Sequence, residues 1–96
     1  MEYILTFSNT NFAIQAEQCL LEKQLRVAVL PLPSQIHAGC GICLRIAPDE
    51  IRQALEALKE RGICESGLFS RTPDANSYSY TEIIDKNIIN KDEATR

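Results

Sequence analysis

Two cysteines separated by two residues are the side chains of this sequence best suited to chemistry. They lie in the stretch SQIHAGCGICLRI, residues 34–46, where Gly39 and Gly41 flank Cys40, and Cys43 follows. His37 precedes Cys40 by three positions. Cys40 is therefore a candidate for four roles: a nucleophilic thiol, a metal ligand, half of a disulfide, or a small packing residue.

Length, charge and the N-terminal residues narrow these choices. A chain of 96 residues with a net charge of -3 and no long run of either sign is expected to form one domain that binds neither nucleic acid nor an anionic membrane. The first residues, MEYILTFSN, carry an acid where a signal peptide needs bases, and their apolar run is short. We therefore expect a cytoplasmic protein whose four cysteines are free thiols.

Hydrophobic patterning predicts alternating strands and helices around this stretch. Ser8, Asn9 and Thr10 are capping residues that follow an apolar strand and precede a helix, and Pro48 and Gly62 mark the two ends of a second helix. The third strand alternates, with Ile42, Leu44 and Ile46 on one face and Cys43 and Arg45 on a wetter face. The expected strands are 2–7, 26–33, 40–46 and 63–69, and the expected helices are 10–24 and 47–62.

This order of elements predicts an α+β fold. Strand, helix, strand, strand, helix, strand is the order of a ferredoxin-like split βαβ sandwich, with a four-stranded antiparallel sheet and two helices on one face. We expect residues 1–70 to form this domain. Residues 71–96 are polar apart from Ile83, Ile84, Ile88 and Ile89, and we expect them to form a tail that is a late helix, a docking arm or disordered.

In such a fold Cys40 is expected near the start of the first helix. The end of the first strand and the loop entering the third strand lie at the same end of the sheet, which places Cys40 close to Ser8, Asn9 and Thr10. The positive end of a helix dipole stabilises a thiolate and so lowers the pKa of a nearby thiol. The flanking glycines, Gly39 and Gly41, leave the sulfur unshielded and allow another backbone to approach. An incidental cysteine in a glycine-rich hairpin is the alternative interpretation.

The same stretch raises a redox and a metal hypothesis. Cys40 and Cys43 spell C-G-I-C, but a thioredoxin-type pair opens a helix, whereas this pair opens a strand, in which residues three apart point to opposite faces. Cys43 is then a packing residue or a thiol that resolves oxidised Cys40. His37, Cys40 and Cys43 are three soft ligands, one fewer than a closed zinc site needs, and the chain has no second pair, so we expect no metal.

Three further side chains have a structural and a functional interpretation. Cys19 lies on the apolar stripe of the first helix with Phe12 and Ala16, and Cys64 enters the last strand, so both are predicted to be core residues. Arg45 is predicted either to hold an anionic group or partner on the exposed sheet face or to be simply solvated.

Three segments together, YILTFSNTNFAIQAE, LPLPSQIHAGCGICLRI and the helix after them, resemble the small domain family called putative selenium or sulfur carrier protein-like. The most specific feature is the Cys40–Gly41 pair at the start of the third strand, after a Pro-x-Pro and a polar loop, with Leu44 and Arg45 following. The resemblance covers about residues 2–69. It implies that Cys40 holds sulfur or selenium as a persulfide-type adduct.

A carrier of this kind needs one good thiol and two protein partners. We expect a protein donor such as a cysteine desulfurase, an acceptor enzyme and no cofactor. One histidine, no glycine-rich nucleotide motif and no paired carboxylates leave little for a self-sufficient enzyme. The alternative from another class is a non-catalytic ferredoxin-like module that binds a partner or ligand through its open sheet face and tail.

Overall fold

The computed structural model describes residues 1–37 and 39–84 of the chain. It contains two α-helices, a short 3₁₀ helix and five strands among these residues. The strands are β1 (Glu2–Thr6), β2 (Val27–Pro31), β3 (Ile42–Ile46), β4 (Gly67–Asp74) and β5 (Ser77–Glu82); the helices are α1 (Thr10–Glu22), η1 (Pro48–Glu50) and α2 (Ile51–Glu60).

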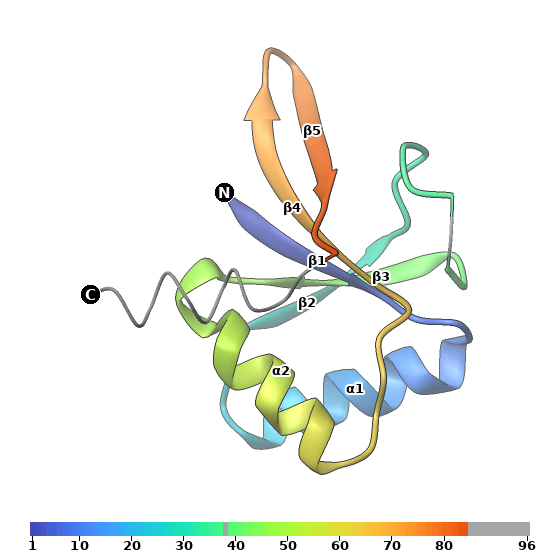
Figure 1. The fold of residues 1–96 in the computed structure, drawn as a ribbon, viewed down its shortest axis with the longest axis vertical. Helices are drawn as coiled ribbons and strands as arrows, with labels where there is room; N and C mark the ends of the chain where they lie inside the picture. The colour runs from blue at the N-terminus through green and yellow to red at the C-terminus, as the bar shows by residue number, and fades with distance from the viewer. Residues whose placement is uncertain (38, 85–96) are drawn as a thin grey trace.

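The strands form one antiparallel sheet in the order β2-β3-β1-β4-β5. Both helices lie on the same face of this sheet, below it in Figure 1. β1 is central and is paired on both sides, which explains its continuous apolar character. The α+β class, the antiparallel sheet and the two helices on one face agree with the sequence prediction.

The sheet is buried unequally on its two faces. The helix-side face carries the larger core, in which Leu5, Leu44 and Leu58 are fully buried. The opposite face has a small apolar cluster of three buried residues, Ile4, Ile36 and Cys43. Neither helix in the described ranges has the length and apolar character that a membrane-spanning segment needs.

The predicted number of strands is wrong, because a fifth strand lies in the segment expected to be a tail. β4 begins at Gly67 and continues to Asp74, and a tight turn with Ala75 at φ 55° leads into β5. Residues 71–82 therefore extend the sheet. The alternation of serine, tyrosine and threonine in β5 is strand-forming, although it is too polar to indicate a buried strand. Ile88 and Ile89 lie outside the described residues.

Two smaller predictions are also corrected. α1 ends at Glu22 rather than near residue 24, because Gln24 adopts a left-handed conformation (φ 62°) and the Leu25 N–H donates to the Leu20 carbonyl at 3.1 Å. Phe12 does not belong to the buried stripe of α1: its side chain is 41% exposed, and Ala13 takes the inward position of that turn.

Candidate functional site

The connection between β2 and β3 positions Cys40. The Leu32 N–H donates to the Gly41 carbonyl at 2.9 Å, which continues the pairing of the two strands beyond their ends. Gly39 and Gly41 adopt φ angles of 143° and 94°, a region that L-residues avoid. A Cβ on Gly41 would meet no atom within 4 Å, so the backbone conformation, and not lack of space, requires glycine there.

The Cys40 side chain is half-buried at the edge of the helix-side core. It lies on the same side of the sheet as Ile42. The alternation of side chains in β3 therefore extends back through Gly41 to Cys40. Its Sγ lies 3.7 Å from the Ile42 carbonyl oxygen, to which the thiol donates. This is a long, weak contact.

Cys40 and the N-terminus of α1 lie at the same end of the sheet. Thr6, the last residue of β1, is opposite Cys43 of β3, and a Cβ on Gly39 would lie 3.6 Å from the Thr6 Cβ. The chain then turns through Ser8 and enters α1, where the Asn9 side-chain oxygen accepts from the Phe12 N–H at 2.9 Å. Asn9 is therefore the cap of this helix, and both Ser8 and Thr10 are exposed.

Cys43 lies on the other face of the sheet and is fully buried, so the expected wetter environment is wrong for this residue. Ile36, in the loop before Cys40, covers this part of the face and is 4% exposed. Burial raises the pKa of the Cys43 thiol above its ordinary value; the Arg71 charge lowers it in part, and the nearby Cys40 raises it further. The thiol form of Cys43 is thus favoured, which makes it a poor nucleophile.

These positions bear directly on the redox and metal hypotheses. Cys40 and Cys43 pack in clusters on opposite faces of the sheet, and both are free thiols. His37 is exposed. Across residues 1–37 and 39–84, no three side chains of His, Cys, Asp or Glu gather closely enough to hold a metal ion. The H-x-x-C-x-x-C spacing therefore does not assemble a ligand set here.

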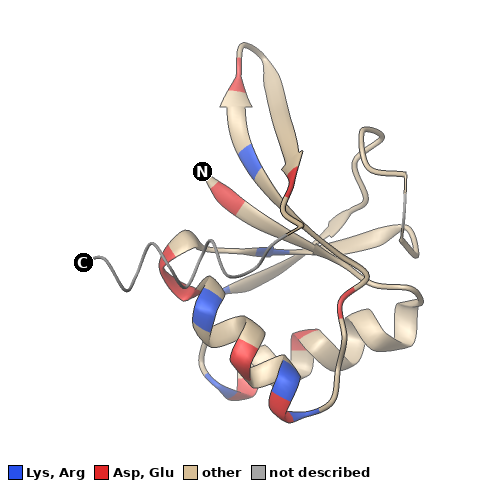
Figure 2. Ribbon diagram, in the orientation of Figure 1, with Lys and Arg blue, Asp and Glu red and all other residues tan. Residues whose placement is uncertain are grey.

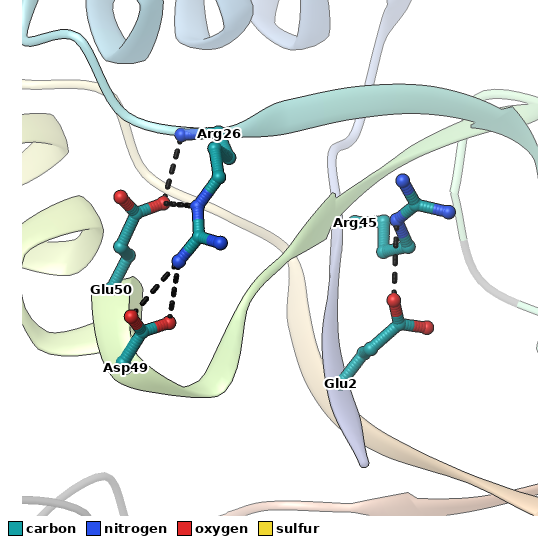
Figure 3. Close-up of polar contacts among 5 residues, drawn as sticks. All are labelled: Glu2, Arg26, Arg45, Asp49 and Glu50. Atoms are coloured by element: carbon teal, nitrogen blue, oxygen red, sulfur yellow. Dashed lines mark hydrogen bonds and ion pairs between the residues drawn. The ribbon is translucent and has the colours of Figure 1, made fainter.

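Arg45 lies on the face opposite Cys40 and toward the other end of β3. Its Nε lies 3.4 Å from Oε2 of Glu2. Figure 3 shows the two side chains pointing toward each other. Glu2 also accepts from Arg71, whose guanidinium is largely buried and stacks 4.0 Å from the centre of the Tyr78 ring. Burial lowers the pKa of Arg71, but hydrogen bonds to Glu2 and Tyr80 outweigh it and raise the pKa overall. Arg45 belongs to this charged group and not to the surroundings of Cys40.

The two remaining cysteines differ from one another. Cys19 is buried at 1% exposure, as predicted, and its thiol donates to the Ala57 carbonyl at 3.6 Å. Cys64 is exposed, so its predicted place in the core is wrong. Its neighbour Ile63 is buried against the end of α2, where its N–H donates to the Leu58 carbonyl, and the strand begins only at Gly67.

Two features that support the Cys40 loop were not predicted from the sequence. Ile36 anchors the loop to the sheet; its only signal is that it is an isolated apolar residue between Gln35 and His37. Thr6, which borders Gly39, is buried and shares a 2.9 Å hydrogen bond with the Ser66 hydroxyl. A Cβ on Gly67 would lie 2.8 Å from the Thr6 Oγ1, so this close approach requires glycine.

Comparison with known proteins identifies a family. Residues 2–70 match the model of the family described as "Putative Se/S carrier protein-like". No curated protein and no solved structure shows a significant match. The matched segment contains all of β1 to α2, the loop with Cys40 and the first part of β4.

Proposed function

Because the chain belongs to the putative Se/S carrier protein-like family, we propose that it carries sulfur or selenium as an adduct on Cys40. The observation that carries the proposal is the placement of this thiol. Cys40 is half-buried on a loop between two glycines with positive φ, whereas Cys19 and Cys43 are buried. The chalcogen atom comes from a protein donor such as a cysteine desulfurase and goes to an acceptor enzyme.

The proposed transfer is an exchange between a thiolate and a persulfide. The Cys40 thiolate attacks the outer sulfur of the donor persulfide, a new S–S bond forms on Cys40, the S–S bond of the donor breaks, and the donor cysteine leaves as a thiolate. The acceptor nucleophile then attacks the outer sulfur on Cys40 in the same way. Neither step needs an external oxidant or reductant, because the outer sulfur keeps its oxidation level.

The surroundings of Cys40 support this chemistry. The N-terminus of α1, at the same end of the sheet, is the positive end of the helix dipole, and it favours an anionic thiolate or persulfide in its vicinity. Ser8, Asn9 and Thr10 are supporting residues in this proposal because they form that terminus. Gly41 has no neighbouring atom within 4 Å of the position a Cβ would take, which leaves room for an approaching partner, whereas Gly39 lies close to Leu32 and Thr6.

The proposal includes a fold family and a cell compartment for the carrier. We assign β1 to β4 and the two helices to a ferredoxin-like split βαβ core, which the strand order β2-β3-β1-β4 supports, with β5 added beside β4.

A cytoplasmic location suits a carrier whose four cysteines are free, because a reducing compartment keeps thiols available.

The two alternative functions have less support. A redox couple of Cys40 and Cys43 requires two sulfurs that meet, but these side chains pack on opposite faces of the sheet. A module that binds through its open sheet face requires that face to be free, but Ile36 covers Ile4 and Cys43 at its centre.

Loading of the protein by a cysteine desulfurase tests the proposal. Incubation with the desulfurase and cysteine is expected to add one sulfur mass to the wild type, measured by intact mass spectrometry without reductant. Cys40→Ser is expected to abolish the addition. Cys64→Ser is the matched control, because Cys64 is also exposed and lies within the matched segment, and it is expected to load normally. Normal loading of Cys40→Ser would refute the site.

A further inference from the structure

Charged residues are distributed very unevenly over the molecule. Lys, Arg, Asp and Glu are absent from residues 3–16 and from residues 27–44. The first segment runs through β1 into α1, and the second runs through β2 and the Cys40 loop into β3. Figure 2 shows the result: the loop and the first half of α1 are free of charge, whereas α2 and the opposite end of the sheet carry many charges.

Many of the charges elsewhere in the described part of the chain form ion pairs. Arg26 donates to both carboxylate oxygens of Asp49 at 2.9 Å and its backbone N–H donates to Glu50 at 2.8 Å (Figure 3). Arg61, just after the C-terminal end of α2, pairs with Glu22 at the C-terminal end of α1. Glu65 precedes Ser66, whose backbone N–H donates to the Thr6 carbonyl. Glu65 itself also takes part in a polar or charged interaction.

The uncharged end of the sheet, where Cys40 lies, also exposes large apolar side chains of α1. Phe12 and Ile14, in the first half of α1, are 41% and 44% exposed. Phe12 and Ile14 are two positions apart and therefore lie on different flanks of the helix. We call the uncharged surface formed by Ser8–Phe12, His37 and Gly39–Gly41 the neutral face. An exposed phenylalanine at this end of the sheet offers apolar area that a binding partner can bury.

We propose that the neutral face is the docking surface of the protein donor, and that the donor presents an uncharged, apolar surface around its persulfide. This inference rests on the proposed carrier function. Direct exchange requires the two sulfurs to touch, so the surfaces around them must lose their water, and burying an unpaired charge there is costly. Protein interfaces accordingly have cores that are depleted in charge, as the neutral face is, and that contain aromatic side chains, which Phe12 supplies here.

Transfer through such a surface does not depend on electrostatic steering. Because no Lys, Arg, Asp or Glu lies on the neutral face, salt has little long-range attraction to screen. The transfer rate from a desulfurase is therefore expected to change by less than about twofold between ~50 and ~500 mM NaCl. A fall of about tenfold over this range would overturn the proposal, since it would show that charged surfaces guide the encounter.

Two sulfur sources separate docking from thiol chemistry. A persulfide-loaded cysteine desulfurase must dock, whereas inorganic polysulfide reaches Cys40 without docking. Phe12→Asp is expected to slow loading from the desulfurase by about tenfold and to leave loading from polysulfide unchanged. Leu21→Asp is the matched control: Leu21 is 51% exposed on the same helix but lies next to Glu22, and this variant is expected to load normally from both sources.

Each other result has a distinct meaning. Equal slowing of Phe12→Asp with both sources, or no slowing with either, would overturn the docking surface. Wild-type protein that polysulfide loads on Cys40 but the desulfurase does not load would also overturn it and would leave the thiol assignment standing. Wild-type protein that neither source loads on Cys40 would instead overturn the carrier function itself.

Discussion

Cys40 and Cys43 are neighbours in sequence, but they occupy opposite environments. Cys40 lies in a glycine loop on the helix side of the sheet and is half-buried, with a weak contact to a backbone carbonyl. Cys43 lies in a regular strand, on the other side, fully buried beneath Ile36. The comparison shows that the pleat of one strand separates an accessible thiol from a protected one over three residues.

The largest expected effect is on thiol accessibility. In the folded protein, we expect alkylation of Cys43 to be at least about a hundredfold slower than that of Cys40, because reagent reaches Cys43 only when the structure opens. Peptide mapping by mass spectrometry after timed iodoacetamide treatment measures both rates. Cys64 is expected to react and Cys19 to be protected, and all four should react at similar rates in denaturant. Similar native rates for Cys40 and Cys43 would contradict the assigned burial.

Removal of the cover over Cys43 is expected to have the next largest effect. Ile36→Ala should lower the free energy of unfolding by about 2 kcal/mol, because it deletes a buried side chain and leaves part of the sheet face uncovered. Urea unfolding measures this loss, and Cys43 should be alkylated faster. Ile14→Ala is the matched control, because Ile14 is 44% exposed, and it should change stability by less than about 0.5 kcal/mol. Equal losses in the two variants would show that Ile36 is not an anchor.

The conformation of the Cys40 loop is expected to contribute a smaller effect. Gly41→Ala should cost about 1 kcal/mol of stability, because alanine is strained at φ 94°, although its Cβ meets no neighbour. Gly62→Ala provides the comparison: Gly62 has a φ of 71° and the same open surroundings. Both variants should lose similar stability in urea, but only Gly41→Ala should change the alkylation rate of Cys40. An unchanged rate in both would argue that the glycine does not shape the thiol site.

The smallest expected effect is a pH dependence that depends on Cys43. Burial raises the pKa of this thiol above its ordinary value of 9.0, so the folded state holds the proton more tightly than the unfolded state. The stability gained from Cys43 is therefore fully present below the ordinary pKa and is lost as the pH rises through the folded pKa. Urea unfolding of the wild type and Cys43→Ala at pH 7 and at about pH 10 should show that the wild-type advantage shrinks. A constant difference would contradict the raised pKa.

Local patterns in the sequence were sufficient to predict most of the helices and strands. Helix ends are marked by the cap at Asn9, the proline at the start of η1 and the glycine after α2. These signals act through contacts within a few residues, so they can be recognised from the local sequence alone. The fifth strand was missed because the two strands of its hairpin are stabilised by their pairing with each other and with β1, and their polar residues give no hydrophobic signal.

For the site, the sequence by itself determined that Cys40 lies between glycines at the entrance of a strand, and that Cys43 points to the other face, because side chains alternate with a period of two. Only the tertiary structure decided how exposed each thiol is. Ile36 folds back over Cys43, and Glu2 holds Arg45 from the neighbouring strand. Burial and ion pairing depend on residues that are distant in sequence, so no local pattern around residue 40 predicts them.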